Sequence, residues 1–435
     1  MKFETIAVHG GYKPDPTTHA VAVPIYQTVA YAFDNTQHGA DLFDLKVTGN
    51  IYTRIMNPTQ DVLEQRLALM EGGVAALALA SGQAAVTYSI QTIAEAGDNV
   101  VSSSALYGGT YNLFAHTLPQ FGIEGRFADY REPDSFEKLI DGKTRAVFVE
   151  SIGNPLGNIT DFARIAEIAH KHGVPLIVDN TVPSPYLLRP FEHGADIVVH
   201  SLTKYLGGHG NSIAGAIVDS GKFPWAEHKT KFKRLNEPDV SYHGVVYTEA
   251  LGAAAYIGRA RVVPLRNMGA AISPFNAFLI LQGMETLPLR MERICDNALA
   301  VAKYLKGHAK VKWVNYAGLP EHESHALAQK YMGGRASGLF TFGVSGGWGA
   351  LPGRVETHHA PGQHRRCQVA CLPSGFHHPS PVVQRRTGQG RGRRGHGAPV
   401  DRHRAHRRLA RRPGAGAGGG VAGRWGAARG KGEVL

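Results

Sequence analysis

Short apolar runs alternate with helical stretches over most of the chain. The runs are Ala75–Leu79, Val100–Ser102, Ala146–Val149, Pro175–Val178, Ile197–Val199 and Ala214–Val218. Continuous apolar runs of this length are typical of strands buried on both faces, and the periodic segments between them, such as Phe162–His172, are typical of crossover helices. The pattern predicts an α/β fold built on a mostly parallel, doubly wound sheet.

The clearest helix boundaries stand ahead of the first strand. Asn57 and Pro58 supply the polar cap and the first-turn proline that begin helices, apolar residues follow at helical spacing, and Gly72-Gly73 ends the pattern. The preceding residues, 1–58, mix polar turns with short apolar pieces and predict an extended N-terminal arm.

A second helical region lies further along the chain. Apolar residues at helical spacing over Pro274–Leu305 predict one long amphipathic element. It leads to Lys312–Val314 and Ser337–Gly343, which predict the first strands of a smaller C-terminal domain. We therefore expect the arm at 1–58, a large domain at 59–255, and at 256–347 the beginning of a small α/β domain that is truncated in this chain.

The net charge of +12 belongs to the last part of the chain. Residues 348–435 hold 16 Arg and 1 Lys against 3 acidic residues, a net charge of +14, which leaves −2 for residues 1–347. The basic segment is rich in Gly, Pro, Arg and His and has almost no periodic apolar residues, so it cannot bury a core of its own. The remainder has the balance of an ordinary globular protein, and nucleic acid is not its expected partner.

The cysteine count and the hydropathy of the chain indicate in which cellular compartment the protein is found. The chain has 3 cysteines, too few for a disulfide framework, which favours a reducing environment. No apolar run stands behind Lys2, and no stretch has the length needed to span a bilayer. We expect a cytoplasmic protein with no membrane partner.

Three polar features follow predicted strands, at the sheet edge where open α/β folds bind ligands. Ser81-Gly82-Gln83 opens a helix after Ala75–Leu79, and its backbone N–H groups would suit a phosphate. Asp179 ends a later run, where a buried carboxylate needs a partner such as a protonated ring nitrogen. Lys204 stands among Ser, Thr and a Gly-Gly bend, a setting that can desolvate its amine and make it nucleophilic.

Each feature alone has an ordinary structural explanation. A small-residue turn between a strand and a helix is usually structural, an acid at the position of Asp179 can cap a helix, and a single lysine is usually a surface residue. Their occurrence together, in this order, strongly favours a functional site over the three separate structural explanations.

A series of short motifs in register resembles the Cys/Met-metabolism family of pyridoxal-phosphate enzymes, the cystathionine synthase/lyase-like group. The resemblance covers residues 1 to about 347. Its motifs are Tyr52-Thr53-Arg54, Ser81-Gly82-Gln83, Tyr107-Gly108-Gly109-Thr110, Asn154-Pro155, Asp179-Asn180-Thr181 and Ser201-Leu202-Thr203-Lys204. The resemblance implies pyridoxal 5'-phosphate as cofactor and fold type I of the pyridoxal-phosphate-dependent transferases.

The resemblance also implies a role for each matched residue. Lys204 would bind the cofactor and, once freed, move protons along the substrate, while Tyr107 would stack on the ring and assist proton transfer. Asp179 would keep the ring nitrogen protonated. The other implied cofactor-binding residues are Gly82, Gln83, Ser201 and Thr203 at the phosphate, Asn154 near the ring, Thr181 in the Asp179 motif, and Tyr52 and Arg54 on the arm. Because Tyr52 and Arg54 would reach a neighbouring subunit, the resemblance implies at least a dimer and commonly a dimer of dimers.

Within the family, three segments most resemble O-acetylhomoserine sulfhydrylases. They are residues 10–28, the stretch His38–Asn57 and the Gln after Ser81-Gly82. Such enzymes join an amino-acid substrate, O-acetylhomoserine, to sulfide by γ-replacement. Cystathionine γ-synthase and γ-lyase are the alternatives within the family, and an Arg/Gly-tailed nucleic-acid-binding protein is the alternative of another class.

The family's C-terminal domain should continue past Gly347 with an arginine that binds the substrate carboxylate. Permitted codons for Arg365–Val369, read one base later, encode Gly-Asp-Ala-Lys-Ser, and those for Gly395–Asp401 encode Asp-Met-Val-Arg-Leu-Ser-Ile. Both products resemble the missing family segments, so we predict that residues 348–435 are translated out of frame. Cys367 and Cys371 could be interpreted as metal ligands, but no second Cys pair follows, and no metal is expected.

Overall fold

The computed structural model describes residues 1–44 and 46–345, with a seven-stranded sheet in the order β1-β7-β6-β5-β4-β2-β3. Its strands are β1 (Ala75–Leu79), β2 (Asn99–Ser103), β3 (Glu124–Ala128), β4 (Thr144–Glu150), β5 (Leu176–Asp179), β6 (Ile197–His200) and β7 (Gly215–Asp219). Neighbours from β3 to β6 are parallel, whereas β7 runs antiparallel between β6 and β1. The predicted α/β fold with a mostly parallel sheet is confirmed.

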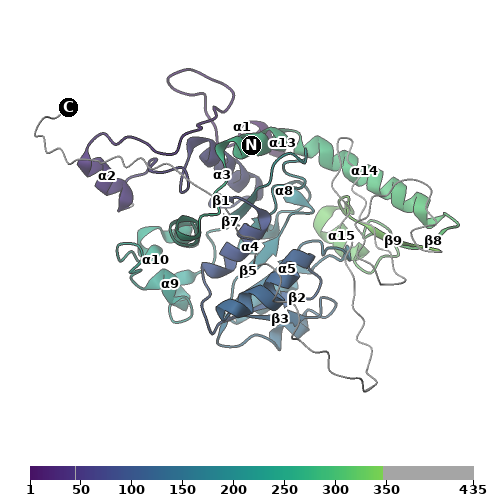
Figure 1. The fold of residues 1–435 in the computed structure, drawn as a ribbon. Coiled ribbons are helices and arrows are strands. Elements are labelled where there is room, and N and C mark those ends of the chain that lie inside the picture. Colours follow the sequence, from purple (N-terminus) through teal and green to yellow (C-terminus); the bar gives the residue numbers. More distant parts are fainter. Residues whose placement is uncertain (45, 346–435) are drawn as a thin grey trace, which may run out of the picture. The chain divides into compact units, whose positions relative to one another are not determined.

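Alternate residues of each strand face two separate cores. In β4, Val147 and Val149 pack on the face that helices α3 (Pro58–Glu71) and α7 (Phe162–Lys171) cover. Ala146 and Phe148 pack on the other face, against α4 (Gly82–Gln91) and α11 (Ala255–Ala260). Because helices cover both faces of the sheet (Figure 1), both sets of strand residues must be apolar, which explains the continuous runs in the sequence.

The helix predicted after Asn57 is α3, and the Asn57 side chain accepts a hydrogen bond from the Thr59 N–H at 2.9 Å. The prediction of an extended arm before it is wrong in part, because the arm contains α1 (Phe3–His9) and α2 (Thr36–Phe43). The short apolar pieces form helices with one apolar face, and Ile6 of α1 packs into the same core as α3.

The predicted element Pro274–Leu305 is two helices, α13 (Pro274–Glu285) and α14 (Leu287–Lys306). Thr286 separates them, and Pro288, which has no backbone N–H to donate, lies in the first turn of α14. The single apolar stripe is therefore a wrong prediction. Phe275, which was assigned to that stripe, is 52% exposed.

A second sheet of two antiparallel strands, β8 (Val311–Asn315) and β9 (Thr341–Val344), follows α14 (Figure 1). It confirms both predicted strands, although β9 is shorter than the predicted range. The remaining α-helices are α5 (Gly108–Asn112), α6 (Asp134–Glu137), α8 (Ser184–Leu187), α9 (Lys233–Asn236), α10 (Tyr247–Ala250), α12 (Arg266–Met268) and α15 (His325–Met332). None of the helices in residues 1–44 and 46–345 combines the length and the apolar character needed to cross a membrane.

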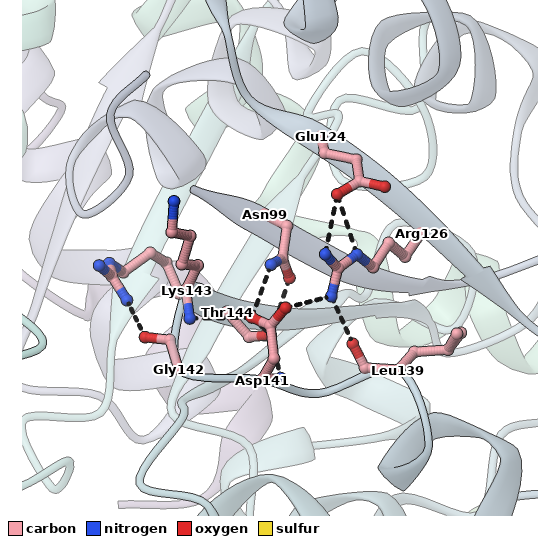
Figure 2. Close-up of polar contacts among 9 residues, drawn as sticks. Asn99, Glu124, Arg126, Leu139, Asp141, Gly142, Lys143 and Thr144 are labelled. Carbon is pink, nitrogen blue, oxygen red and sulfur yellow. Dashed lines mark hydrogen bonds and ion pairs between the residues drawn. The ribbon is translucent and has the colours of Figure 1, made fainter. Parts of the chain in front are cut away.

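A polar cluster joins the amino ends of three strands (Figure 2). Asp141 accepts hydrogen bonds from Asn99 of β2 at 2.9 Å and from Arg126 of β3 at 2.7 Å, and Arg126 also pairs with Glu124 at 2.9 Å. Partial burial acts to raise the pKa of Asp141, but the hydrogen bonds from Arg126, Asn99 and the Lys143 N–H outweigh it and hold the pKa well below its usual range. The ionised Asp141 therefore stabilises the fold.

We expect Asp141→Asn to lower the free energy of unfolding by about 1 kcal/mol near neutral pH, a small value because the pair is partly exposed. Since the pKa is lower in the folded chain, this contribution is present above the ordinary carboxylate pKa and is lost as pH falls below ~4. Urea unfolding at several pH values measures the difference. Glu124→Gln, which removes a more exposed partner, should cost less. A difference between Asp141→Asn and the parent that stays constant on acidification would contradict this account.

Candidate active site

The predicted site residues gather at the carboxyl edge of the sheet. Asp179 is the last residue of β5 and is paired in register with Glu150, the last residue of β4. Ser201 follows β6 directly, and Ser81 follows the end of β1. The parallel register brings the ends of β4, β5 and β6 to one edge, and β1, which like β6 is antiparallel to β7, ends at the same edge.

The turn after β1 packs directly on the turn after β6. Ser81 caps α4, its hydroxyl accepting a hydrogen bond from the Ala84 N–H at 3.1 Å. A Cβ atom on Gly82 would lie 2.6 Å from the Cβ of Ser201, so only glycine allows this approach. The Ser201 N–H in turn donates to the Thr181 hydroxyl at 2.8 Å. Gly82, Thr181 and Ser201 are therefore brought together at the N-terminus of α4.

The loop that carries Lys204 is anchored on both sides of that residue. Thr203 exchanges two hydrogen bonds with the backbone of Ala214, at 3.0 and 3.1 Å, and Leu202 and Leu206 are buried. The Lys204 side chain is exposed. The expectation that this loop desolvates the lysine is therefore not met in the single chain, because its neighbours point inward and Lys204 points out.

Asp179 lies where a cationic partner would stabilise it. Its Oδ1 accepts a hydrogen bond from the Thr181 N–H at 2.9 Å, and burial raises the pKa of its carboxyl group. Within the described part of the chain, no lysine or arginine forms an ion pair with it. The helix-cap explanation is wrong, since the next helix, α8, begins only after Pro183.

Tyr107 and Gln83 come together from the starts of two helices. The Gln83 side-chain amide donates to the Gly109 carbonyl, two residues beyond Tyr107, at 3.4 Å. Tyr107 precedes α5 and its side chain is 41% exposed, which leaves its ring available to a ligand. Asn154 follows the end of β4, at the same edge of the sheet.

Tyr52 and Arg54 are not brought to this group. The Arg54 guanidinium lies 5.4 Å from the centre of the Tyr52 ring, and both side chains are exposed. No hydrogen bond or ion pair among residues 1–44 and 46–345 joins either side chain to the strand-end residues.

A buried network behind the site was missed from the sequence. Glu71, the last residue of α3, accepts hydrogen bonds from His200 at 2.6 Å and from Asn180 at 2.9 Å. Asn180 and His200 adjoin Asp179 and Ser201, so the network fixes two of the site's loops to α3. Asn180 and His200 could have been found from the sequence because they adjoin predicted site residues, whereas no local pattern indicates Glu71.

Arg290 was also missed. This residue of α14 donates to the carbonyls of Tyr205 at 2.6 Å and Leu206 at 3.3 Å, so it holds the backbone directly after Lys204. Burial lowers its pKa to about 10. At Gly208 the φ of 72° favours glycine, and a Cβ atom there would overlap the guanidinium in its present position. No sequence signal links Arg290 to a loop so far away in the chain.

Comparison with known proteins decides the family. The family described as Cys/Met metabolism PLP-dependent enzymes matches residues 4–357. The chain belongs to this family. Its cofactor is pyridoxal phosphate, which supplies an electron sink for negative charge that develops on the substrate.

Similar proteins include two named for sulfur chemistry on homoserine derivatives or homocysteine. The O-acetyl-L-homoserine sulfhydrylase of Leptospira meyeri is 55% identical over 339 residues, 76% of each chain. The homocysteine synthase of Schizosaccharomyces pombe is 53% identical over 346 residues, 79% of this chain and 81% of that one. A crystal structure from Campylobacter jejuni, named for an O-acetylhomoserine (thiol)-lyase and holding a pyridoxyl-lysine phosphate, superposes with a TM-score of 0.77 at 44% identity, covering 79% of this chain and 85% of that one.

The described residues of this pyridoxal-phosphate enzyme fit its cofactor. The N-terminus of α4, closed against Ser201, offers backbone N–H groups of the kind that bind phosphate. Asp179 offers a carboxyl group whose raised pKa a pyridinium partner would lower. The described residues contain no group of three or more His, Cys, Asp or Glu side chains placed to hold a metal ion. The Cys367 and Cys371 pair lies outside the described residues.

If Lys204 binds the cofactor covalently, borohydride should fix pyridoxal phosphate to the parent chain. We expect Lys204→Ala to abolish that fixation, because no other amine would occupy this loop. Mass spectrometry of the reduced protein measures it. Lys222→Ala, which removes another exposed lysine, should leave fixation unchanged. Fixation that persists in Lys204→Ala would show that another amine binds the cofactor.

Proposed function

We propose that this enzyme catalyses γ-replacement on O-acetylhomoserine, using sulfide or a thiol to give homocysteine or methionine and acetate. The observation that carries the proposal is the 55% and 53% identity to an O-acetyl-L-homoserine sulfhydrylase and a homocysteine synthase over most of the chain. Cystathionine γ-synthase and γ-lyase activities remain the alternatives within the family.

We propose roles for the residues of the site accordingly. Lys204 binds the cofactor and carries protons between the α- and β-carbons of the substrate. Tyr107, at the start of α5 with an accessible ring, stacks on the cofactor and assists proton transfer. Asp179 keeps the ring nitrogen protonated, and Asn154 orients the ring. Gly82, Gln83, Ser201 and Thr203 bind the phosphate, with Thr181 supporting Ser201 through their 2.8 Å hydrogen bond.

We propose that the arm acts in a neighbouring subunit of a homo-oligomer, a dimer of dimers. The exposed side chains of Tyr52 and Arg54 support this, as they are free to reach a second chain. The arm also exposes large apolar side chains, Val21 at 77% and Val29 at 59%, which a partner subunit would bury. A cytoplasmic location is proposed from the low cysteine count of the chain, which is too small for a disulfide framework.

The substrate proposal is tested by comparing initial rates with O-acetylhomoserine plus sulfide, O-succinylhomoserine plus sulfide, and cystathionine. We expect homocysteine to form fastest from O-acetylhomoserine and sulfide, since this is the substrate named for the relatives. A chain with the reading frame restored after Gly347 serves best for these rates. Faster turnover of cystathionine than of O-acetylhomoserine would overturn the proposal in favour of a lyase.

We propose further that residues 348–435 are an out-of-frame translation that replaces most of the small domain. The family match ends at residue 357, and about a quarter of the Leptospira relative lies outside the match, since 76% of it is covered. Around the start of the small domain, α14 and β8 expose Leu289 at 75%, Tyr304 at 68% and Trp313 at 40%. Such apolar side chains are ones that the rest of a domain would cover.

We expect the chain as written to be poorly soluble and at least about tenfold slower than the frame-restored chain, because an out-of-frame tail would lack the arginine that contacts the substrate carboxylate. Sedimentation and initial rates of the two chains measure both effects. A control chain that ends at Gly347 separates the loss of the domain from any harm done by the tail. Equal turnover by the written and restored chains would show that the tail supplies its own carboxylate site.

A further inference from the structure

Glu150 is a buried acid at the centre of the site that no proposed role yet uses. It ends β4, and its side chain is 5% exposed. Its Oε1 accepts the N–H of Tyr107 at 2.6 Å, and its Oε2 accepts the N–H of Asn154 at 3.1 Å. One carboxylate therefore holds the backbone of two proposed site residues, each through a different oxygen.

The surroundings of Glu150 make it an unusual structural residue. Its neighbour in register is another carboxylate, Asp179, and no lysine, arginine or histidine among the described residues forms an ion pair with it. Burial and then the charge of Asp179 raise the pKa of Glu150 well above its usual range. Burying an acid here costs folding free energy. Glu150 offsets that cost by accepting two backbone N–H groups, which requires two acceptor oxygens.

The two hydrogen bonds join separate loops. Tyr107 precedes α5 in the segment after β2, and Asn154 lies in the turn after β4, so their backbones come from different strand ends. The Glu150 backbone is fixed in the sheet and by the Thr160 hydroxyl, which donates to the Glu150 carbonyl at 2.7 Å. A rigid strand end thus sets the distance between the two loops.

We propose that Glu150 is a positioning residue that sets Tyr107 and Asn154 on the cofactor by accepting both backbone N–H groups. The inference rests on the proposed roles of Tyr107 and Asn154. Glutamine cannot replace Glu150 fully, because its amide offers one acceptor oxygen and turns two N–H donors toward the second backbone N–H. Aspartate keeps both acceptors on a shorter side chain, and is expected to retain part of the function.

The test is Glu150→Gln in the full chain, with pyridoxal phosphate titrated into cofactor-free protein and followed by absorbance and visible circular dichroism. We expect about tenfold weaker cofactor binding, corresponding to one lost hydrogen bond, and an altered dichroic band from the reoriented ring. Glu150→Asp should lie between Glu150→Gln and the parent. Asp196→Asn is the matched control, since Asp196 is a buried carboxylate that accepts the Leu176 N–H at 2.8 Å at the opposite edge of the sheet. It should alter the melting temperature but neither cofactor signal.

A double variant tests whether Glu150→Gln weakens cofactor binding through Tyr107 and Asn154. In a chain that carries both Tyr107→Ala and Asn154→Ala, Glu150→Gln should weaken cofactor binding less than twofold, because the side chains it positions are gone. An undiminished tenfold effect there would overturn the proposal and show that Glu150 acts on the cofactor or on Asp179 directly. Unchanged affinity and dichroism in Glu150→Gln would overturn it as well. If instead Tyr107→Ala and Asn154→Ala have no effect in the parent, their proposed roles fail, whatever Glu150 does.

Discussion

The parallel register of β4, β5 and β6 sets the positions on which the site depends. It places Glu150 opposite Asp179 and Asp179 opposite Val199, so the residues that follow these strands emerge at one edge. Helices cover both faces of the sheet, and polar groups can only collect where the strands end. A shift of one residue in any of these strands would exchange its two faces and move the strand-end acid away from the site.

The site is costly for the fold, because it concentrates buried polar groups. Burial raises the pKa of both Glu150 and Asp179, and neither carboxylate has a basic side chain as a partner among the described residues. Hydrogen bonds offset part of this cost. Backbone N–H groups donate to Glu150 and Asp179, and Glu71 accepts hydrogen bonds from His200 and Asn180 behind them. The same hydrogen bonds fix the loops. They therefore stabilise the buried acids and also make the site rigid.

The sequence predicted the central sheet and most of the site's elements because both follow local rules. Buried strands appear in the sequence as apolar runs. Asp179 directly follows one run, and His200 and Ser201 follow another. β3 was missed because it is an edge strand with partly exposed residues, such as Arg126, and has no continuous apolar run. The helices of the arm and the break at Thr286 depend on what each short segment packs against, which periodicity does not encode. Glu150 was overlooked although it ends a predicted strand as Asp179 does, since its partners are backbone groups of loops whose paths no local pattern gives.

The contact between Arg290 and the Lys204 loop limits which side chains the loop tolerates. The guanidinium fills the space beside Gly208 and donates to carbonyls rather than to an acid, so its place is defined by shape as much as by charge. A side chain at position 208 would require the Arg290 guanidinium to move away from the Tyr205 and Leu206 carbonyls. Substitution of Gly208 would therefore loosen the backbone that follows Lys204, although more than eighty residues separate Gly208 from Arg290 along the chain.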